Sequence, residues 1–150
     1  MFWALRALVL AVWALWHPGI ERSGFAGEIA SAITIVVIAD GARAPVMGSH
    51  AEDAVLMAVY AYRESSLREG LSGDEGRSWG VWQLPAAAGK LDVISQARAW
   101  LVLLHRGAIV CPKSPAAPLA GGCAAARRVA DRRAATARKL LTAALARRAD

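Results

Sequence analysis

The sequence predicts a single, mainly α-helical domain with one small β-hairpin. Its 150 residues are enough for one domain, and a chain of this length buries roughly two-thirds of the surface that its unfolded form exposes. The composition is 56% hydrophobic and only 7% aromatic, with Ala, Leu and Val supplying most of the apolar mass, which favours packed helices over a β-sandwich. Apolar residues at helical spacing dominate the chain, and one glycine-rich stretch interrupts them.

The first predicted helix covers residues 2–16, which are apolar apart from Arg6. It is expected to end near His17-Pro18, because proline cannot continue a helix. The segment is shorter than the roughly twenty residues that cross a bilayer. Two interpretations of residues 1–25 stay open. They form a signal peptide or an anchor that would associate with a membrane through residues 2–16, or else the first helix of a domain that continues over 26–150.

Two further helices are predicted ahead of the glycine-rich stretch. Residues 26–39 are expected to form a buried helix, although their β-branched side chains would also suit a strand. Ser49 is placed to cap the next helix, with Glu52 at the spacing of a capping box. That helix runs from about His50 to Glu64, and its core face consists of Ala54, Val55, Met57, Ala58, Ala61 and Tyr62.

Residues 65–85 differ from the rest of the chain because glycines at positions 70, 73, 76 and 80 interrupt the helical pattern. A short strand or hairpin is expected here, formed by Trp79, Val81, Trp82 and Leu84. Beyond Pro85, helices are predicted over residues 95–106 and from Ala124 to about Arg147. The last helix is expected to direct its apolar side chains inward: Val129, Leu140, Leu141, Ala144 and Leu145.

The chain carries a formal net charge of +6, which predicts attraction to polyanions. Most of the excess follows Cys123, where only Asp131 and Asp150 oppose a run of basic residues: Arg127, Arg128, Arg132, Arg133, Arg138, Lys139, Arg147 and Arg148. A solvated helix surface explains this run as well as a binding surface for anionic polymers does. No motif that recognises a nucleic-acid groove accompanies it, so a nucleic acid is not expected as the partner.

The two cysteines, Cys111 and Cys123, flank a loop rich in proline and glycine. A disulfide could close such a short, stiff loop in an oxidising compartment, and two free buried thiols are the alternative. No histidine or further cysteine lies at metal-ligand spacing, so a metal is not expected. The sequence also lacks a glycine loop for nucleotides and a Ser–His–Asp set, and no cofactor is expected.

Three short motifs follow one another around the glycine-rich stretch: Glu64-Ser65-Ser66, Gly73-Asp74-Glu75-Gly76 and Gly80-Val81-Trp82-Gln83-Leu84-Pro85. Glu64 ends an apolar helix, so its side chain is expected to project from rigid structure into the wall of a cleft. Partial burial and a nearby helix C-terminus both favour the protonated form of a carboxyl group, which a general acid needs. On position alone, a solvated surface charge is the commoner alternative.

These motifs resemble those of the soluble lytic transglycosylase and goose-type lysozyme superfamily. Members have a catalytic Glu followed by Ser at a helix end, and a downstream Gly-Leu-Met-Gln-like strand whose Gln lines the sugar groove. In this sequence Glu64 matches the acid, Ser65 its neighbour and Gln83 the substrate-contacting position. The match covers residues 54–85, with a looser helical likeness to about residue 140. It implies a lysozyme-like α+β helical domain in which a small β-hairpin lines the cleft.

The activity that the resemblance implies is cleavage of the β-1,4 bond between MurNAc and GlcNAc in peptidoglycan. In a transglycosylase, Glu64 would protonate the leaving oxygen and then accept the proton of the muramic acid C6 hydroxyl, leaving a 1,6-anhydro end. In an inverting hydrolase, a second carboxylate would activate water. Asp74 is the candidate, because its glycine-framed loop resembles the Asp loop of goose-type lysozymes. A turn residue bonded to its own backbone is the alternative for Asp74.

Tryptophan stacks on sugar faces, which makes the tryptophans near Gln83 candidates for the groove. Strand alternation would put Trp79, Val81 and Gln83 on one face and Trp82 on the other. Trp79 is therefore expected in the groove beside Gln83, and Trp82 beneath it. Core packing of both tryptophans and a surface position for Gln83 are the alternatives.

Two departures from the family pattern keep a second function open. Residues 118–122, Pro-Leu-Ala-Gly-Gly, stand where relatives carry Tyr-Asn-x-Gly, and Pro85 stands where goose-type enzymes place an Asp. The alternative is a non-catalytic envelope or phage structural protein that keeps the fold to hold glycan. Either protein would work in the periplasm, outside the cell or on a virion, with peptidoglycan as its partner. The basic C-terminal helix, far along the chain from Glu64, would bind anionic wall polymers and take no part in the chemistry.

Overall fold

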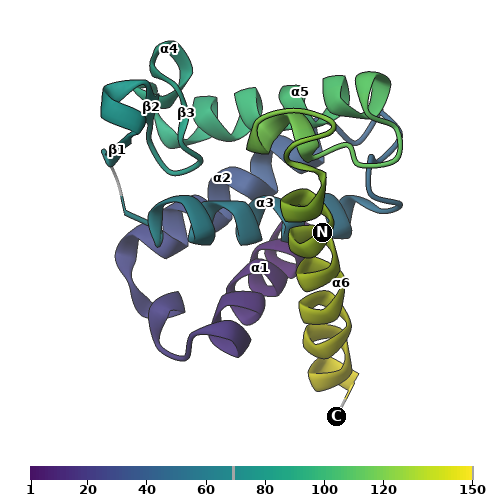
Figure 1. The fold of residues 1–150 in the computed structure, drawn as a ribbon. Helices are drawn as coiled ribbons and strands as arrows, with labels where there is room; N and C mark the ends of the chain where they lie inside the picture. The colour runs from purple at the N-terminus through teal and green to yellow at the C-terminus, as the bar shows by residue number, and fades with distance from the viewer. Residues whose placement is uncertain (69, 150) are drawn as a thin grey trace.

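The computed structural model describes residues 1–68 and 70–149 and is mainly helical (Figure 1), as the sequence predicts. The α-helices are α1 Phe2–Trp16, α2 Gly24–Ala39, α3 His50–Ser65, α4 Ala86–Gly89, α5 Val93–Val110 and α6 Arg127–Ala149. Between α3 and α4 in the sequence lies a three-stranded antiparallel sheet, made of β1 Ser72–Gly73, β2 Ser78–Trp79 and β3 Leu84–Pro85. Short 3-10 turns are η1 Ile20–Arg22, η2 Asp74–Gly76 and η3 Ala117–Ala120.

The buried helix α3 is the centre of the fold. Every residue from Asp53 to Ala61 is buried, and α1, α2, α5 and α6 all pack against this helix. Its N-terminus is capped as expected. The Glu52 backbone N–H donates to the Ser49 hydroxyl oxygen at 3.1 Å, and that hydroxyl donates to the Glu52 carboxylate at 3.2 Å. From Ala54 to Ala61 the helix is apolar on all sides, and such a helix needs neighbours around its whole circumference.

The N-terminal helix α1 packs into the same core. Its buried residues are Leu8, Val9, Val12 and Trp13, and the Trp13 indole N–H donates to the Ala58 carbonyl oxygen of α3 at 3.1 Å. In the structure residues 2–16 pack as a helix against α2, α3 and α6. One hydrophobic core includes residues from both sides of position 25. No helix among the described residues is long and apolar enough to cross a membrane.

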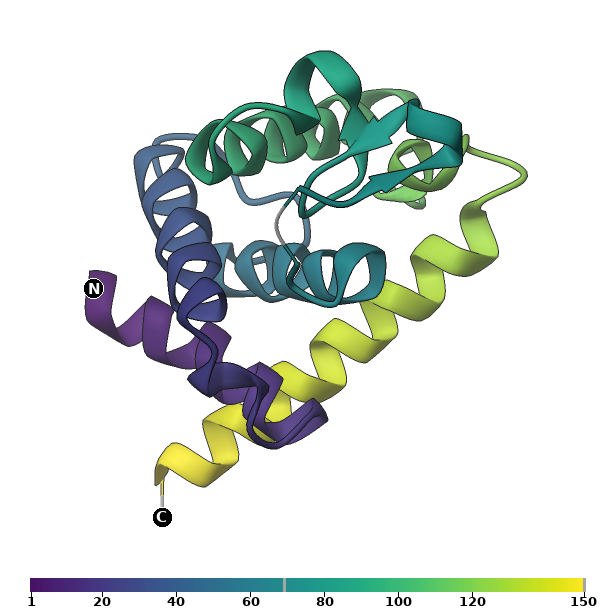
Figure 2. The ribbon, with the colours of Figure 1, turned by 90° about the vertical axis from the view of Figure 1, so that its left-hand side faces the viewer.

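Helix α6 lies along α1 and α3 (Figure 2). Its buried stripe consists of Ala130, Ala137, Leu141 and Ala144. Small side chains let α6 approach α3 closely and leave larger ones at the margin of the contact. Val129 and Leu140 are accordingly only partly buried. The expectation that Leu145 points inward is wrong, because this residue is 51% exposed near the end of the helix.

Helix α5 is longer than the predicted 95–106 and leads into the proline-rich loop. Asp92 caps its start by accepting the Ser95 backbone N–H at 3.0 Å. Beyond its end, Cys111 and Cys123 form the disulfide considered from the sequence, with their Cα atoms 5.7 Å apart. The loop lies tightly on α5, since a Cβ atom on Gly107 would come within 1.8 Å of the Pro115 carbonyl oxygen.

Replacing both Cys111 and Cys123 with Ser is expected to lower the free energy of unfolding by roughly 3 kcal/mol, because the open loop gains conformational entropy in the unfolded chain. Urea unfolding of the double variant measures this loss. Wild-type protein unfolded in excess reductant is the matched control and should give the same midpoint. An unchanged midpoint in both would show that the disulfide contributes nothing to stability.

Candidate active site

The C-terminus of α3 fixes the position of Glu64. Ser66 and Leu67 follow the helix with φ angles of 51° and 59°, which is left-handed backbone that non-glycine residues rarely adopt. The Ser66 backbone N–H donates to the Tyr62 carbonyl oxygen at 2.8 Å, and the Leu67 side chain is buried in the core. The chain therefore leaves α3 by one well-anchored route, and Glu64 lies in the last turn before it.

Glu64 forms an ion pair with Arg133 of α6. The Glu64 side chain is 26% exposed and the Arg133 side chain 19%, so the pair is partly shielded from water. The Arg133 guanidinium carbon also lies 4.4 Å from the ring centroid of Tyr60, one turn before Glu64 on α3. A cation held by both a carboxylate and an aromatic face has a restricted position, so Arg133 restrains the Glu64 carboxylate.

Tyr60 anchors this cluster to the interior. Its hydroxyl donates to the Ala116 carbonyl oxygen at 3.3 Å, and its ring lies 5.3 Å from that of Trp100 on α5. Burial raises the pKa of Tyr60, and the positive charge of Arg133 acts in the opposite direction. Tyr60 is therefore a neutral phenol at neutral pH, and the face of its ring contacts the Arg133 guanidinium.

The glycine-rich stretch folds as the small sheet, with β2 in the middle. Residues 80–83 form the turn between β2 and β3. Of the strand or hairpin predicted for this segment, the structure has the hairpin, with Trp79 paired to Leu84, and the continuous strand through Gly80-Val81-Trp82-Gln83 that the family resemblance implies is wrong. Gly80 and Gln83 have φ angles of 80° and 48°, and the Gln83 N–H donates to the Gly80 carbonyl oxygen at 3.2 Å. The predicted alternation fails for the same reason, since the adjacent Val81 and Trp82 are both buried.

Trp82 attaches the sheet to α3. Its side chain is buried beneath the turn, as expected, and its indole N–H donates to the Met57 carbonyl oxygen at 2.9 Å. The Val81 N–H donates to the Gln96 side chain of α5 at 2.9 Å. In Figure 2 the C-terminal end of α3 accordingly lies between the sheet and α6.

The Gln83 side chain forms hydrogen bonds with the backbone on both sides of β2. Its amide N–H groups donate to the carbonyl oxygens of Leu71 and Gly80, both at 2.9 Å. Its amide oxygen would lie only 2.2 Å from a Cβ atom on residue 73, so the glycine there leaves room for the Gln83 side chain. The partly buried Gln83 side chain is thus engaged with backbone, whereas the family resemblance implies contact with sugar.

Trp79 and Asp74 lie on the outer part of the hairpin. The Trp79 indole N–H donates to the Gly76 carbonyl oxygen at 2.8 Å, and the Lys90 amine lies 4.3 Å from the ring centroid. Asp74 is exposed and its carboxylate accepts the Ser78 hydroxyl at 2.8 Å. Asp74 thus lies in a turn, as its alternative has it, but its carboxylate bonds the Ser78 hydroxyl and not its own backbone. Trp79 stays partly accessible.

Ser65 is placed differently from a substrate-contacting residue. It is buried, and its hydroxyl donates to the Ala61 carbonyl oxygen at 2.9 Å. The Ser65 hydroxyl is therefore bonded within α3 and, in this conformation, presents little surface to a ligand.

The basic helix α6 reaches the candidate site directly. The expectation that its charges are remote from Glu64 is wrong, because α6 packs along α3 and brings Arg133 to the carboxylate. Beside the pair lies an open depression of about 510 Å³, whose lining residues are Arg63, Val129, Arg132, Arg133, Ala135 and Thr136. We refer to it as the basic pocket.

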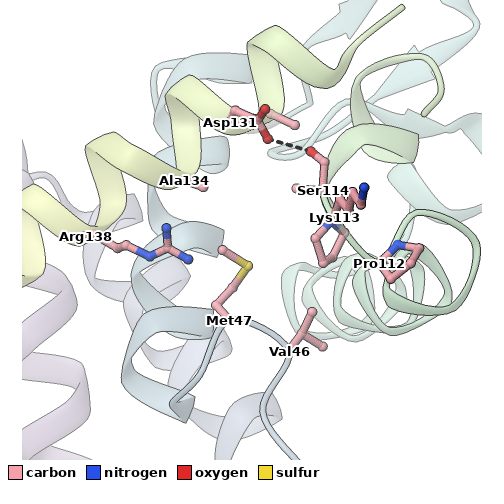
Figure 3. Close-up of a pocket in the computed structure, with 11 residues that line it drawn as sticks. Val46, Met47, Pro112, Lys113, Ser114, Asp131, Ala134 and Arg138 are labelled. Carbon is pink, nitrogen blue, oxygen red and sulfur yellow. Dashed lines mark hydrogen bonds between the residues drawn. The ribbon is translucent and has the colours of Figure 1, made fainter. Parts of the chain in front are cut away.

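A second pocket, of about 280 Å³, lies between α6, the loop after Cys111 and residues 46–47 (Figure 3). The Ser114 hydroxyl donates to the Asp131 carboxylate at 2.8 Å, and Arg138 pairs with Glu52 at 3.5 Å. By helical periodicity, Asp131, Ala134 and Arg138 lie on the opposite flank of α6 from the basic pocket. The Asp131 carboxylate and the Arg138 guanidinium are thus paired within the fold, and Glu64 does not line this pocket.

No cluster of three or more His, Cys, Asp or Glu side chains among the described residues could hold a metal ion. Comparisons of the chain with protein-family models, with curated proteins and with solved structures gave no match. The candidate site therefore stands on its geometry: Glu64 lies in the last turn of a buried helix and is paired with Arg133, which also lines the basic pocket.

Proposed function

We propose that the protein cleaves the glycan strands of peptidoglycan at the β-1,4 bond between MurNAc and GlcNAc, with Glu64 as general acid and base. The observation that carries the proposal is the placement of Glu64, a partly exposed carboxylate held at the end of a buried helix. A sheet fastened to that helix lies beside it and bears the partly accessible Trp79. In this proposal the chain has a lysozyme-like arrangement, and the sheet forms one wall of the sugar site.

The ion pair gives Arg133 a part in the mechanism. While the pair is intact, Glu64 is a carboxylate and has no proton to donate. The first step therefore requires Arg133 to separate from Glu64, after which the carboxyl group takes up a proton from solvent and passes it to the leaving glycosidic oxygen. The carboxylate that remains is then the base for the second step, in which it takes up a proton again. Release of that proton to solvent and renewed pairing with Arg133 return the site to its starting state.

The second step favours the transglycosylase outcome. Glu64 accepts the proton of the muramic acid C6 hydroxyl, and the C6 oxygen bonds to C1, which leaves a 1,6-anhydro end without water. This route needs only one carboxylate. An inverting hydrolase needs a second carboxylate that holds water, whereas Asp74 bonds to Ser78 within its own turn.

Incubation of the protein with purified, insoluble peptidoglycan tests the proposal. Soluble muropeptides should appear in proportion to protein and time. Sedimentation of the protein with the wall, without release of fragments, would support the alternative of a non-catalytic glycan-binding protein. The observation in favour of that alternative is that the side chains of Gln83, Ser65 and Asp74 form hydrogen bonds within the protein, where the catalytic proposal would have them contact substrate or water.

Asp74→Asn is expected to lower the rate of fragment release by less than about tenfold, because the transglycosylase route uses Glu64 alone. An initial-rate assay on the same peptidoglycan measures the effect. A loss of roughly 10²–10⁴-fold, the range for removing an essential general base, would instead identify Asp74 as the group that activates water and the protein as a hydrolase.

A further inference from the structure

The basic pocket carries more positive charge than its surroundings neutralise. Three arginines line it: Arg63, Arg132 and Arg133. Arg63 lies 4.8 Å from the ring centroid of Trp16, and the Arg132 Nε–H donates to the Arg128 carbonyl oxygen at 3.3 Å. Within the part of the chain that the structure describes, neither of these two guanidinium groups forms an ion pair with a carboxylate.

The opposite flank of α6 differs. There Arg127 pairs with Asp131 and Arg138 with Glu52, each at 3.5 Å. The positive charge of α6 is thus balanced on one flank and left open on the flank beside Glu64. An accessible depression of about 510 Å³ lined by unneutralised guanidinium groups is suited to an oxyanion, because the planar guanidinium donates parallel hydrogen bonds to carboxylate or phosphate oxygens.

We propose that the basic pocket is a subsite for the carboxylates of the peptide stems on the glycan substrate, and that its occupation draws Arg133 away from Glu64. This inference rests on the proposed function. The sugars around the scissile bond carry no free carboxylate once the stem is attached, so in this substrate the stem supplies the anions. A phosphodiester wall polymer offers the same oxyanion chemistry, and a binding experiment with glycerol phosphate oligomers distinguishes it from the stem peptide.

Arg133 links the pocket to the reaction because it belongs to both sites. In the free protein its anionic partner is Glu64. A stem carboxylate bound between Arg63 and Arg132 offers Arg133 a second anion and so competes with Glu64 for it. Glu64 loses its partner when this substrate is bound and is then free to accept a proton from solvent. Peptide-bearing glycan thereby promotes its own cleavage, whereas bare glycan does not.

The test measures binding without catalysis. The probe is the N-acetylated stem peptide L-Ala-γ-D-Glu-L-Lys, titrated calorimetrically into the full chain, with the same peptide amidated at both carboxylates as a control. Arg63→Gln and Arg132→Gln are each expected to weaken binding by about fivefold or more. Glu64→Gln should strengthen binding by about threefold or more, because it removes the anion that competes for Arg133. Arg127→Gln, which removes the same charge from the opposite flank, should change affinity by less than about twofold.

Equal binding of the amidated peptide, or equal weakening by Arg127→Gln and Arg63→Gln, would overturn the subsite. Unchanged affinity in Glu64→Gln would overturn the competition for Arg133. Glycerol phosphate oligomers form the second arm, and binding of these in place of the peptide would overturn the assignment to stem carboxylates. Peptide binding by a protein that cleaves no wall would refute the proposed function but not the subsite. Cleavage of the wall without peptide binding would refute the subsite but not the proposed function.

Discussion

Glu64→Gln is expected to lower the rate of peptidoglycan cleavage by roughly 10²–10⁴-fold, the range for losing a general acid. Glutamine keeps the shape of the side chain and an oxygen that can accept a hydrogen bond from Arg133. It has no proton to give to the leaving oxygen and cannot act as a base in the second step. Initial rates of muropeptide release measure the loss.

Glu75→Gln is the matched control, because Glu75 is an exposed acid on the hairpin. It should retain activity close to that of the wild type. Thermal unfolding should show that both variants are fully folded at the assay temperature, so that a loss of rate is not a loss of fold. An active Glu64→Gln protein would assign the chemistry to another residue.

Trp82→Ala is expected to lower the free energy of unfolding by roughly 3–5 kcal/mol, the cost of truncating a large buried aromatic side chain. The change removes the packing beneath the turn and the hydrogen bond to the Met57 carbonyl oxygen, which together fasten the sheet to α3. Urea denaturation measures the loss. Trp3→Ala is the control, since Trp3 is 75% exposed and its removal should change stability by no more than about 0.5 kcal/mol. Similar losses in both variants would mean that Trp82 does not anchor the sheet.

Local signals in the sequence predict the helix that presents Glu64. Ser49 and Glu52 lie three residues apart and cap its start. Of the predicted core face, Ala54, Val55, Met57, Ala58 and Ala61 are buried and Tyr62 is only partly buried, while residues outside that face are buried too: Leu56, Val59 and Tyr60. The start of α3 depends on neighbours within one turn, which is why spacing alone identifies it.

The sequence allows either a strand or a hairpin at residues 79–84, and contacts with distant residues decide in favour of the turn at 80–83. Trp79, Val81 and Gln83 alternate as in a strand, but the left-handed backbone of Gly80 is packed against Gln96 and Gly89 of other elements. The hydrogen bonds of Gln83 to Leu71 likewise span the hairpin. Only the folded arrangement decides between the strand and the hairpin.

Arg133 could not be paired with Glu64 from spacing, because 69 residues separate them. One weak signal is present in the sequence. Arg133 lies three residues after Ala130 and four before Ala137, both of which are buried on α6. An arginine at the edge of a buried stripe needs an anionic or aromatic partner, and here Glu64 and Tyr60 supply both.

The most direct test of Glu64-dependent glycan cleavage is mass spectrometry of peptidoglycan treated with wild-type protein or Glu64→Gln. Wild-type digests should contain new glycan ends, predominantly 1,6-anhydromuramic acid, which is lighter than a reducing end by one water. The Glu64→Gln digest should match untreated wall. New ends in equal amounts from both proteins, or none from the wild type on wall that it demonstrably binds, would contradict glycan cleavage by Glu64.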